Sequence, residues 1–358
     1  MTDQASAEQP IIAGLKPCLV QLQEGKRYFW CSCGRSKTQP FCDGSHAGTR
    51  FKPLMFVADK TEEVLLCACK RTASPPFCDG SHNNLQDTYE EASAGEIAAM
   101  AGATLVARDP AKGGKAVLDG GAYVLSPDAA KDQKNGTLAW QRLIGAADGA
   151  KHISLYRFVA GAGPSPWQSY GQSEVVLFVV AGSGAVLIED RRFDAGPQTG
   201  VFIAKGEAFA FDAKTPMTIM ATICPQVNAP AFGDGPTGHF DAAIIARTAP
   251  VDHDKAQVMA DRFFQVLIDE HTGSHEITEF IGEVPKSRAA MHRHLYEEAI
   301  VILSGEGMMW TEHCRAPVSP GDIIFLSRRQ SHSLECTDEA GMRLMGAFYP
   351  AGSPAINY

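Results

Sequence analysis

The stretch CSCGRSKTQPFCDGSH at residues 31–46 returns 36 positions later as CACKRTASPPFCDGSH at residues 67–82. Each copy carries three cysteines and one histidine at the same internal spacing. In chain order these residues are Cys31, Cys33, Cys42 and His46, then Cys67, Cys69, Cys78 and His82. A ligand set duplicated at constant spacing predicts two metal centres built in the same way.

The ligand types narrow the choice of metal. Thiolates are soft ligands that select iron–sulfur clusters, zinc or cuprous copper. Structural zinc sites usually pair knuckles with distant partners, whereas all four ligands here lie within sixteen residues around Cys-x-Cys. The pattern resembles the CDGSH (NEET) family of 2Fe–2S proteins over about residues 15–90. The resemblance implies a tandem, pseudo-symmetric domain in which the eight residues bind two 2Fe–2S clusters; a pair of zinc knuckles is the alternative.

Histidine in place of one thiolate has a physical consequence. A neutral ligand makes the cluster less negative and raises its reduction potential. Protonation of the imidazole in mild acid can also break the iron–histidine bond. Such a centre can pass single electrons or release its cluster, and both uses stay open. Asp43 and Asp79, which follow a ligand cysteine, are expected to organise the turn by accepting backbone N–H groups.

Composition bounds the class of protein. The 358 residues are 45% hydrophobic and 20% charged, which is ordinary for a chain of two or three domains. A net charge of −9 argues against nucleic acid or an anionic membrane as a partner. The start, MTDQASAEQP, lacks a targeting pattern, and no apolar run reaches transmembrane length. We therefore expect a cytoplasmic protein whose four remaining cysteines are reduced.

Three segments follow one another along the chain, and we expect a mainly β fold. Residues 1–90 hold the repeat. Residues 91–145 shift to Ala, Gly, Lys and Asp and are predicted to be a linker, with a short helix and a strand at 122–125. From 146 onward, β-branched and aromatic runs alternate with Gly and Pro turns, which predicts a sandwich or barrel.

The β region is itself doubled. VVAGSGAVLIED at 179–190 corresponds to ILSGEGMMWTEH at 302–313, with two glycines in each matched to two in the other. This correspondence predicts two tandem barrels, at residues 146–248 and 249–358.

The second barrel carries a candidate metal site. His292, His294 and Glu298 share parity, so on one continuous strand all three project from the same face. His332 follows the next turn and strand. The segments MHRHLYEEAIVILSGEG (291–307) and PGDIIFLSRRQSH (320–332) resemble the two cupin motifs. The resemblance implies a double-stranded β-helix whose three histidines and one carboxylate bind a divalent metal, iron first, with Mn, Ni or Zn as alternatives. Glu297 would replace Glu298 if the strand bulged.

The first barrel lacks these candidate metal ligands. Counting back from the matched glycines places Ser169, Gly171 and Val175 at the positions of His292, His294 and Glu298, and Phe209 or Phe211 near that of His332. We therefore expect a barrel without metal ligands that serves as a packing partner.

These features together suggest an oxidoreductase. The clusters would feed electrons, received from an external reductase, to a cupin iron that acts on a small organic substrate as an oxygenase. Arg293 and Tyr296 flank the ligands and are candidates for substrate contact. The alternatives are a non-redox isomerase, decarboxylase or hydrolase with regulatory clusters, and a non-catalytic redox or iron sensor. Barrels of this kind also suggest a homo-oligomer paired through exposed edges.

Overall fold

The computed structural model describes residues 9–14, 17–79, 81–82, 94–259 and 262–355. The chain divides into two compact units. One unit comprises residues 1–89 together with 353–358, and the other comprises residues 90–352. The predicted boundary at 90/91 and Gly80 of the second motif fall outside the described residues.

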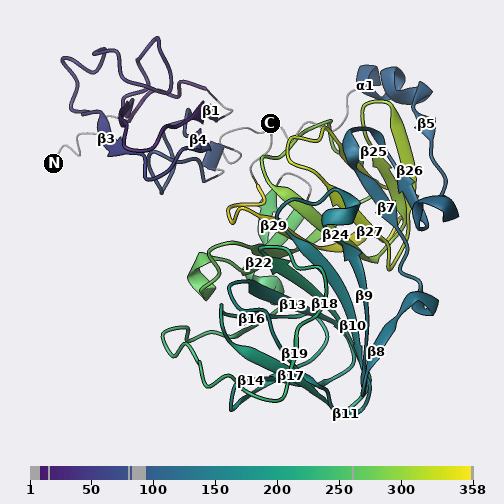
Figure 1. Cartoon of the computed structure of the whole chain (residues 1–358). Helices are drawn as coiled ribbons and strands as arrows, with labels where there is room; N and C mark the ends of the chain where they lie inside the picture. The colour runs from purple at the N-terminus through teal and green to yellow at the C-terminus, as the bar shows by residue number, and fades with distance from the viewer. Residues whose placement is uncertain (1–8, 15–16, 80, 83–93, 260–261, 356–358) are drawn as a thin grey trace, which may run out of the picture. The chain divides into compact units, whose positions relative to one another are not determined.

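The N-terminal unit consists of two small antiparallel sheets that exchange strands between the sequence repeats (Figure 1). The first repeat supplies β1 (Cys18–Gln21) and β2 (Arg27–Trp30), and the second supplies β3 (Leu54–Val57) and β4 (Glu63–Leu66). β1 pairs with β4, and β2 pairs with β3. Each sheet therefore contains one strand from each repeat, which is the internal pseudo-symmetry expected from the duplication.

The two ligand motifs are held by matching backbone contacts. Each motif follows directly on a strand, β2 or β4. The N–H of Cys31 donates to the carbonyl of Pro40, and the N–H of Cys67 donates to that of Pro76, both at 2.9 Å. The strand ends form equivalent isolated bridges, Trp30 with Phe41 and Leu66 with Phe77. Identical turns thus gather both sets of ligands.

The second unit contains two barrels, each formed from a pair of sheets (Figure 1). The larger sheet of the first barrel has the order β20 (Thr248–Pro250), β16 (Thr199–Ile203), β13 (Glu174–Ala181), β18 (Met217–Cys224), β10 (Ser154–Ala160), β9 (Leu138–Ile144) and β8 (Gln133–Asn135). Its smaller sheet has the order β15 (Arg191–Ala195), β14 (Gly184–Ile188), β17 (Ala208–Ala213), β12 (Trp167–Ser169) and β19 (Phe232–Gly233), with β11 (Gly163–Pro164) paired to β17.

The second barrel repeats this plan. Its larger sheet has the order β21 (Gln257–Met259), β22 (Arg262–Ile268), β23 (Thr278–Val284), β29 (Met342–Tyr349), β24 (Glu297–Ser304), β27 (Ile323–Leu326), β7 (Tyr123–Leu125) and β6 (Lys115–Val117). Its smaller sheet has the order β28 (Ser333–Cys336), β25 (Gly307–Trp310), β26 (Cys314–Val318) and β5 (Thr104–Leu105). The prediction of a mainly β fold with two tandem barrels is confirmed.

The segment predicted as a linker is largely built into the barrels, so that prediction was wrong for its described part. β7 pairs with β27, and β5 pairs with β26; β26 and β27 are strands of the second barrel. β8 and β9 extend the larger sheet of the first barrel. The Ala- and Gly-rich composition did not predict these strands. They are stabilised by pairing with distant strands rather than by the β propensity of their own residues.

Helical structure is sparse in the described residues. α1 (Ala94–Ala99) continues into the 3-10 turn η2 (Met100–Gly102). Six further 3-10 turns are η3 (Pro110–Lys112), η4 (Asp119–Gly121), η5 (Ala129–Lys131), η6 (Ala146–Asp148), η7 (His253–Lys255) and η8 (Glu270–Thr272). No helix in the described ranges is long and apolar enough to span a membrane.

The barrels pack against each other through the outer faces of their larger sheets. One apolar cluster joins the barrels and includes Val176, Phe178 and Phe202 of the first and Ile281, Ala299 and Phe325 of the second. A separate cluster fills the interior of the first barrel and includes Phe158, Phe209 and Phe211. Burial of this apolar area is the main driving force that holds the barrels together.

Two glutamates clamp the barrels reciprocally. Glu297, the first residue of β24, accepts the backbone N–H groups of residues 151–153 of the first barrel at 2.8–3.0 Å. Glu174, the first residue of β13, accepts the N–H groups of His275 and Glu276 and the hydroxyl of Ser274 in the second. Both carboxylates are buried. This clamp occupies Glu297, so that residue is not available as the alternative metal ligand.

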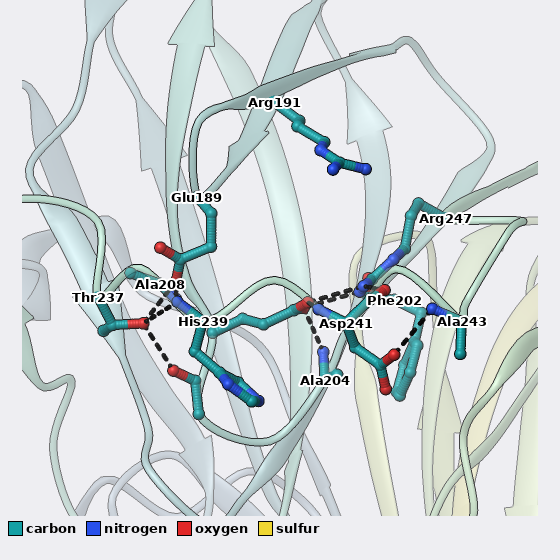
Figure 2. A network of polar contacts seen from close by, with 12 residues as sticks. Glu189, Arg191, Phe202, Ala204, Ala208, Thr237, His239, Asp241, Ala243 and Arg247 are labelled. Carbon is teal, nitrogen blue, oxygen red and sulfur yellow. Dashed lines mark hydrogen bonds and ion pairs between the residues drawn. The ribbon is translucent and has the colours of Figure 1, made fainter.

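A second polar network lies in the first barrel (Figure 2). Arg247 is buried and donates two hydrogen bonds of 2.7 Å to the carboxylate of Glu207. Glu189 accepts from the hydroxyl of Thr237 at 2.7 Å and from the N–H of Gly238 at 2.8 Å. Each buried charge in this network therefore has its partners, as such charges require.

Candidate metal centres

The eight candidate cluster ligands meet in pairs. Sγ of Cys31 lies 3.6 Å from Sγ of Cys33, and Sγ of Cys67 lies 3.5 Å from Sγ of Cys69. Sγ of Cys42 lies 3.1 Å from Nδ1 of His46, and Sγ of Cys78 lies 3.3 Å from Nδ1 of His82. None of these cysteines forms a disulfide. Two ligand atoms at such a spacing can share one metal ion, since a thiolate sulfur would lie about 2.3 Å and an imidazole nitrogen about 2.0 Å from it.

The arrangement in pairs fits a two-iron cluster better than a zinc knuckle. A single tetrahedral zinc would need all four ligand atoms of a motif gathered around one point. Across the described residues, however, only three histidines of the second barrel form a group of three or more ligand atoms within 4.8 Å of one another. Two separate pairs per motif suit a cluster with two iron atoms, one held by two thiolates and the other by thiolate and imidazole.

The aspartate after the third cysteine organises each turn, as the sequence predicts. Asp43 accepts the N–H groups of Lys37 at 2.8 Å and Ser45 at 3.0 Å, which lowers the pKa of its carboxyl group. Asp79 accepts from Ala73 at 2.6 Å and from Ser81 at 2.9 Å in the same way. These bonds hold the loop between the ligand pairs in one conformation.

Three imidazoles converge at one end of the second barrel. His292 and His332 face each other across an isolated bridge, with their rings 4.4 Å apart. The ring of His294 lies 5.0 Å from that of His292 and 4.9 Å from that of His332. The structure thus brings together the three predicted histidines, although β24 begins only at Glu297. The assumption of one continuous strand was wrong, because His292 and His294 lie in the segment that leads into β24.

Backbone carbonyls orient two of these rings. Nδ1 of His292 lies 2.8 Å from the carbonyl of Ala290, and Nδ1 of His332 lies 2.8 Å from that of Gln330. A proton on Nδ1 leaves the lone pair on Nε2 for a metal. Burial lowers the pKa of His292 to about 4 and that of His332 to about 3, so both rings are neutral at physiological pH.

Glu298 supplies the acidic member of the set. Its Oε2 lies 3.8 Å from Nε2 of His294 and is buried without a hydrogen-bond partner. Burial raises the pKa of Glu298 to about 8. A buried carboxyl oxygen left unsatisfied beside three imidazoles is the donor set that a divalent cation needs, so the residues present fit a mononuclear metal.

The first barrel has different residues at the same places. Because β14 pairs with β17 as β25 pairs with β28, Phe209 occupies the position of His332. Gln168 pairs with Phe209 as His292 pairs with His332, which makes Gln168 and Tyr170 the counterparts of His292 and His294. The counted equivalence of Ser169 and Gly171 was therefore wrong by one residue, because the loop before β13 is one residue longer. Val175 stands where the second barrel has Glu298.

Comparisons with known proteins agree with both halves of the molecule. The family described as "Iron-binding zinc finger CDGSH type" matches residues 14–47 and 54–83, and the family described as "Cupin domain" matches residues 282–348. The chain thus joins a domain of the CDGSH type to a pair of cupin-like barrels. The CDGSH domain is 51% identical over 55 residues to mouse CDGSH iron-sulfur domain-containing protein 3, mitochondrial, and 53% identical over 56 residues to the human protein. These matches span 15% of this chain and 40% and 44% of the relatives' own length.

Solved structures share the bicupin fold. A mutant of Bacillus subtilis oxalate decarboxylase superposes with a TM-score of 0.53 at 11% identity, over 64% of this chain and 77% of the other. A structure concerned with the Mn(II) centres of the same enzyme gives a TM-score of 0.52 at the same identity and coverage. The protein Ylba from E. coli gives 0.51 at 14% identity, over 65% of this chain and 92% of the other. At these identities the likeness concerns the fold.

Further residues of the cupin site were less visible in the sequence. Tyr296, a predicted candidate, stacks between His294 at 4.3 Å and Phe348 at 3.9 Å. Arg293 is exposed. The positive charge of Arg262, at the start of β22, acts on His292 and contributes to its lowered pKa. No local motif marks Arg262, because its place beside the histidines depends on the closure of the barrel.

The two centres of the CDGSH domain are not equivalent. Gly34 and Lys70 occupy the same place in the two motifs, and both have positive φ. Lys70 is buried, donates through Nζ to the carbonyl of Cys67 at 2.9 Å, and lies 4.5 Å from the centre of the Trp30 ring. A side chain at Gly34 would collide with the carbonyl of Ile11. Only the second motif therefore brings its own buried cation.

Proposed function

We propose that the protein is an oxidoreductase in which two 2Fe–2S clusters supply single electrons to a mononuclear iron site in the second barrel, which acts on a small organic substrate with dioxygen. The observation that carries the proposal is the convergence of three imidazoles beside a buried carboxyl oxygen that has no hydrogen-bond partner. A cation among them would satisfy the carboxylate, which otherwise costs free energy in an apolar barrel.

The residues of the barrel would act as follows. His292, His294 and His332 offer Nε2 lone pairs, and Glu298 offers a carboxylate once a cation lowers its pKa. When bound, the metal supplies one-electron chemistry and a Lewis-acid centre. Tyr296 packs between His294 and Phe348, and these rings keep water from that side of the site.

The CDGSH domain supports the redox part of the proposal. A histidine ligand raises the potential of each cluster relative to one held by four thiolates, so each can accept electrons from an external reductase. A covalent connection between donor and acceptor gives effective concentrations on the order of millimolar for flexible linkers. Electron transfer within the chain would then not depend on diffusion.

A second candidate is a non-redox decarboxylase. It is favoured by the bicupin neighbours, which include oxalate decarboxylase with Mn(II) centres. In that case the metal would act as a Lewis acid on a small carboxylic acid, and the clusters would regulate the enzyme.

The test begins with metal and acid-labile sulfide analysis of the purified full chain, followed by oxygen uptake of the reduced protein with a panel of small carboxylic and amino acids. We expect four cluster irons, four sulfides and one further iron, as two 2Fe–2S clusters and one mononuclear site require. His332→Ala should lose the further metal and the oxygen uptake while it keeps the sulfide content.

The matched control is His253→Ala, since that side chain is exposed and far from the ligand set in sequence. It should keep both the metal and the activity. Manganese in the barrel with anaerobic release of CO₂ would favour the decarboxylase, and metal content unchanged in the His332 variant would exclude the site itself.

A further inference from the structure

A basic cleft opens beside the second barrel, lined by segments far apart in the sequence. Its volume is about 620 Å³, which is in the range of sites for small organic ligands. Its charged lining residues are Lys112, Lys115, Lys151, Arg328, Asp148 and Glu297. Its floor is aromatic, because Tyr123 and Phe325 pack there with ring centres 5.3 Å apart.

The charges of this cleft are unbalanced in favour of cations. Four basic and two acidic residues leave two net positive charges, in a protein whose overall charge is −9. Both acids are already engaged, because Asp148 pairs with Lys115 and Glu297 accepts three backbone N–H groups. Among the residues that the structure describes, Lys112, Lys151 and Arg328 have no carboxylate partner, and they can attract an anion to the cleft.

The cleft lies on the opposite face of the sheet from the histidines. Residues paired directly across antiparallel strands share a face, and adjacent residues of a strand face opposite ways. Glu298 faces the histidines, as its 3.8 Å distance from His294 shows. Ala299, Phe325 and Tyr123 are paired in register on the other face, where the cleft is. A ligand in the cleft would therefore not touch the metal.

Two contacts nevertheless connect the wall of the cleft to the metal ligands. Nε of Arg328 donates to the carbonyl of Leu295, the residue after His294. Gly120 packs so closely against Gln330 that a side chain there would collide with it. Gln330 in turn accepts from Nδ1 of His332 through its carbonyl. Movement of Arg328 or Gly120 toward a ligand would shift the supports of two histidines.

We propose that this cleft binds a small organic anion with at least two negative charges, carried by carboxylate or phosphate groups, and that its occupancy changes how tightly the barrel holds its metal. The cations would bind the anionic groups, and the aromatic floor would pack against the remainder of the ligand. The first part is independent of the proposed function. The second rests on the proposed metal centre.

Binding is tested on the full chain by isothermal titration with succinate and, separately, with inorganic phosphate at low salt. The stronger of the two identifies the source of the charge. Lys112→Gln with Lys151→Gln should weaken binding at least tenfold. Asp148→Asn removes the acid that engages Lys115 and should tighten binding several-fold.

The matched control is Lys134→Gln with Lys214→Gln, which removes the same charge from exposed positions outside the cleft. It should change affinity less than twofold. If both double variants weakened anion binding equally, the effect would come from the net charge of the protein, and the proposed site would be wrong. Absence of heat with both succinate and phosphate in the unaltered protein would do the same.

Coupling to the metal is measured as the rate at which the second barrel loses its metal to EDTA, with and without the stronger anion. We expect at least a threefold change in the unaltered protein at saturating anion. The change should be smaller in Arg328→Gln, which loses the contact with the carbonyl of Leu295 but keeps that of Gly120 with Gln330. An unchanged rate with proven anion binding would overturn the effector role alone. Absence of any barrel metal would instead show that the proposed function has failed.

Discussion

The two barrels of the bicupin share their frame and differ in their interior. A glutamate begins the equivalent strand of each barrel, Glu174 in the first and Glu297 in the second. Each of them accepts hydrogen bonds from a loop of the other barrel. Inside, the second barrel has three histidines where the first has Gln168, Tyr170 and Phe209. Packing between the barrels therefore explains why the frame is the same in both, and the proposed chemistry depends on a few interior positions of the second.

The barrels also treat a buried carboxyl group differently. Glu207 in the first barrel accepts two hydrogen bonds from Arg247, so its charge is compensated within the protein. Glu298 in the second has no hydrogen-bond partner at Oε2. A carboxylate whose charge is compensated by an arginine supports the fold, whereas one without a hydrogen-bond partner fits the proposed cation site.

The largest expected effect comes from breaking the compensated pair. Arg247→Met leaves Glu207 buried without its counter-charge and should lower the free energy of unfolding by roughly 3–5 kcal/mol. Urea unfolding followed by circular dichroism measures the loss. Arg192→Met is the control, because its pair with Asp212 is exposed and solvent screening should make its contribution much smaller. Similar losses in the two variants would contradict the assignment of a structural role to the buried pair.

The uncompensated carboxyl group predicts a pH-dependent effect of about 3 kcal/mol. The folded pKa of Glu298, about 8, lies above its usual value, so its contribution to stability is full at acid pH and is lost as pH rises through 8. Glu298→Gln does not ionise. In metal-free protein, the free energy of unfolding of the variant relative to the unaltered chain should rise by on the order of 3 kcal/mol between pH 5 and pH 8.

Urea unfolding in the presence of EDTA at the two pH values measures this gain. Added metal should reverse the sign at pH 8, because the carboxylate then has its cation and glutamine is the poorer ligand. Val175→Gln at the matching position of the first barrel is the control, and its cost should not depend on pH. A pH-independent difference for the Glu298 variant would mean that the side chain is not buried in its acid form.

The sequence predicted local features well and long-range ones poorly. The spacing of cysteines and histidines predicted which of these side chains lie together, because each set lies within one turn or between adjacent strands. The sequence predicted a strand at 122–125, where β7 lies. It did not predict that this strand belongs to the second barrel, because that depends on pairing with β27 some 200 residues later. Likewise, the role of Glu297 depends on residues 151–153 of the other barrel. A single inserted residue before β13 misled the count of equivalent positions.

The smallest expected effect concerns Gln168 and Tyr170, which stand in the first barrel where the second has histidines of the candidate metal site. The hydroxyl of Tyr170 donates to Oε1 of Gln168 at 2.8 Å, while Nε2 of Gln168 is buried without a partner. Tyr170→Phe leaves that oxygen unpaired and should cost about 1–2 kcal/mol in urea unfolding. Adding Gln168→Leu removes both unsatisfied groups and should restore most of the loss. If the double variant were instead less stable than Tyr170→Phe alone, the glutamine would have an interaction beyond this bond, and the first barrel could not be regarded as a site filled only by packing.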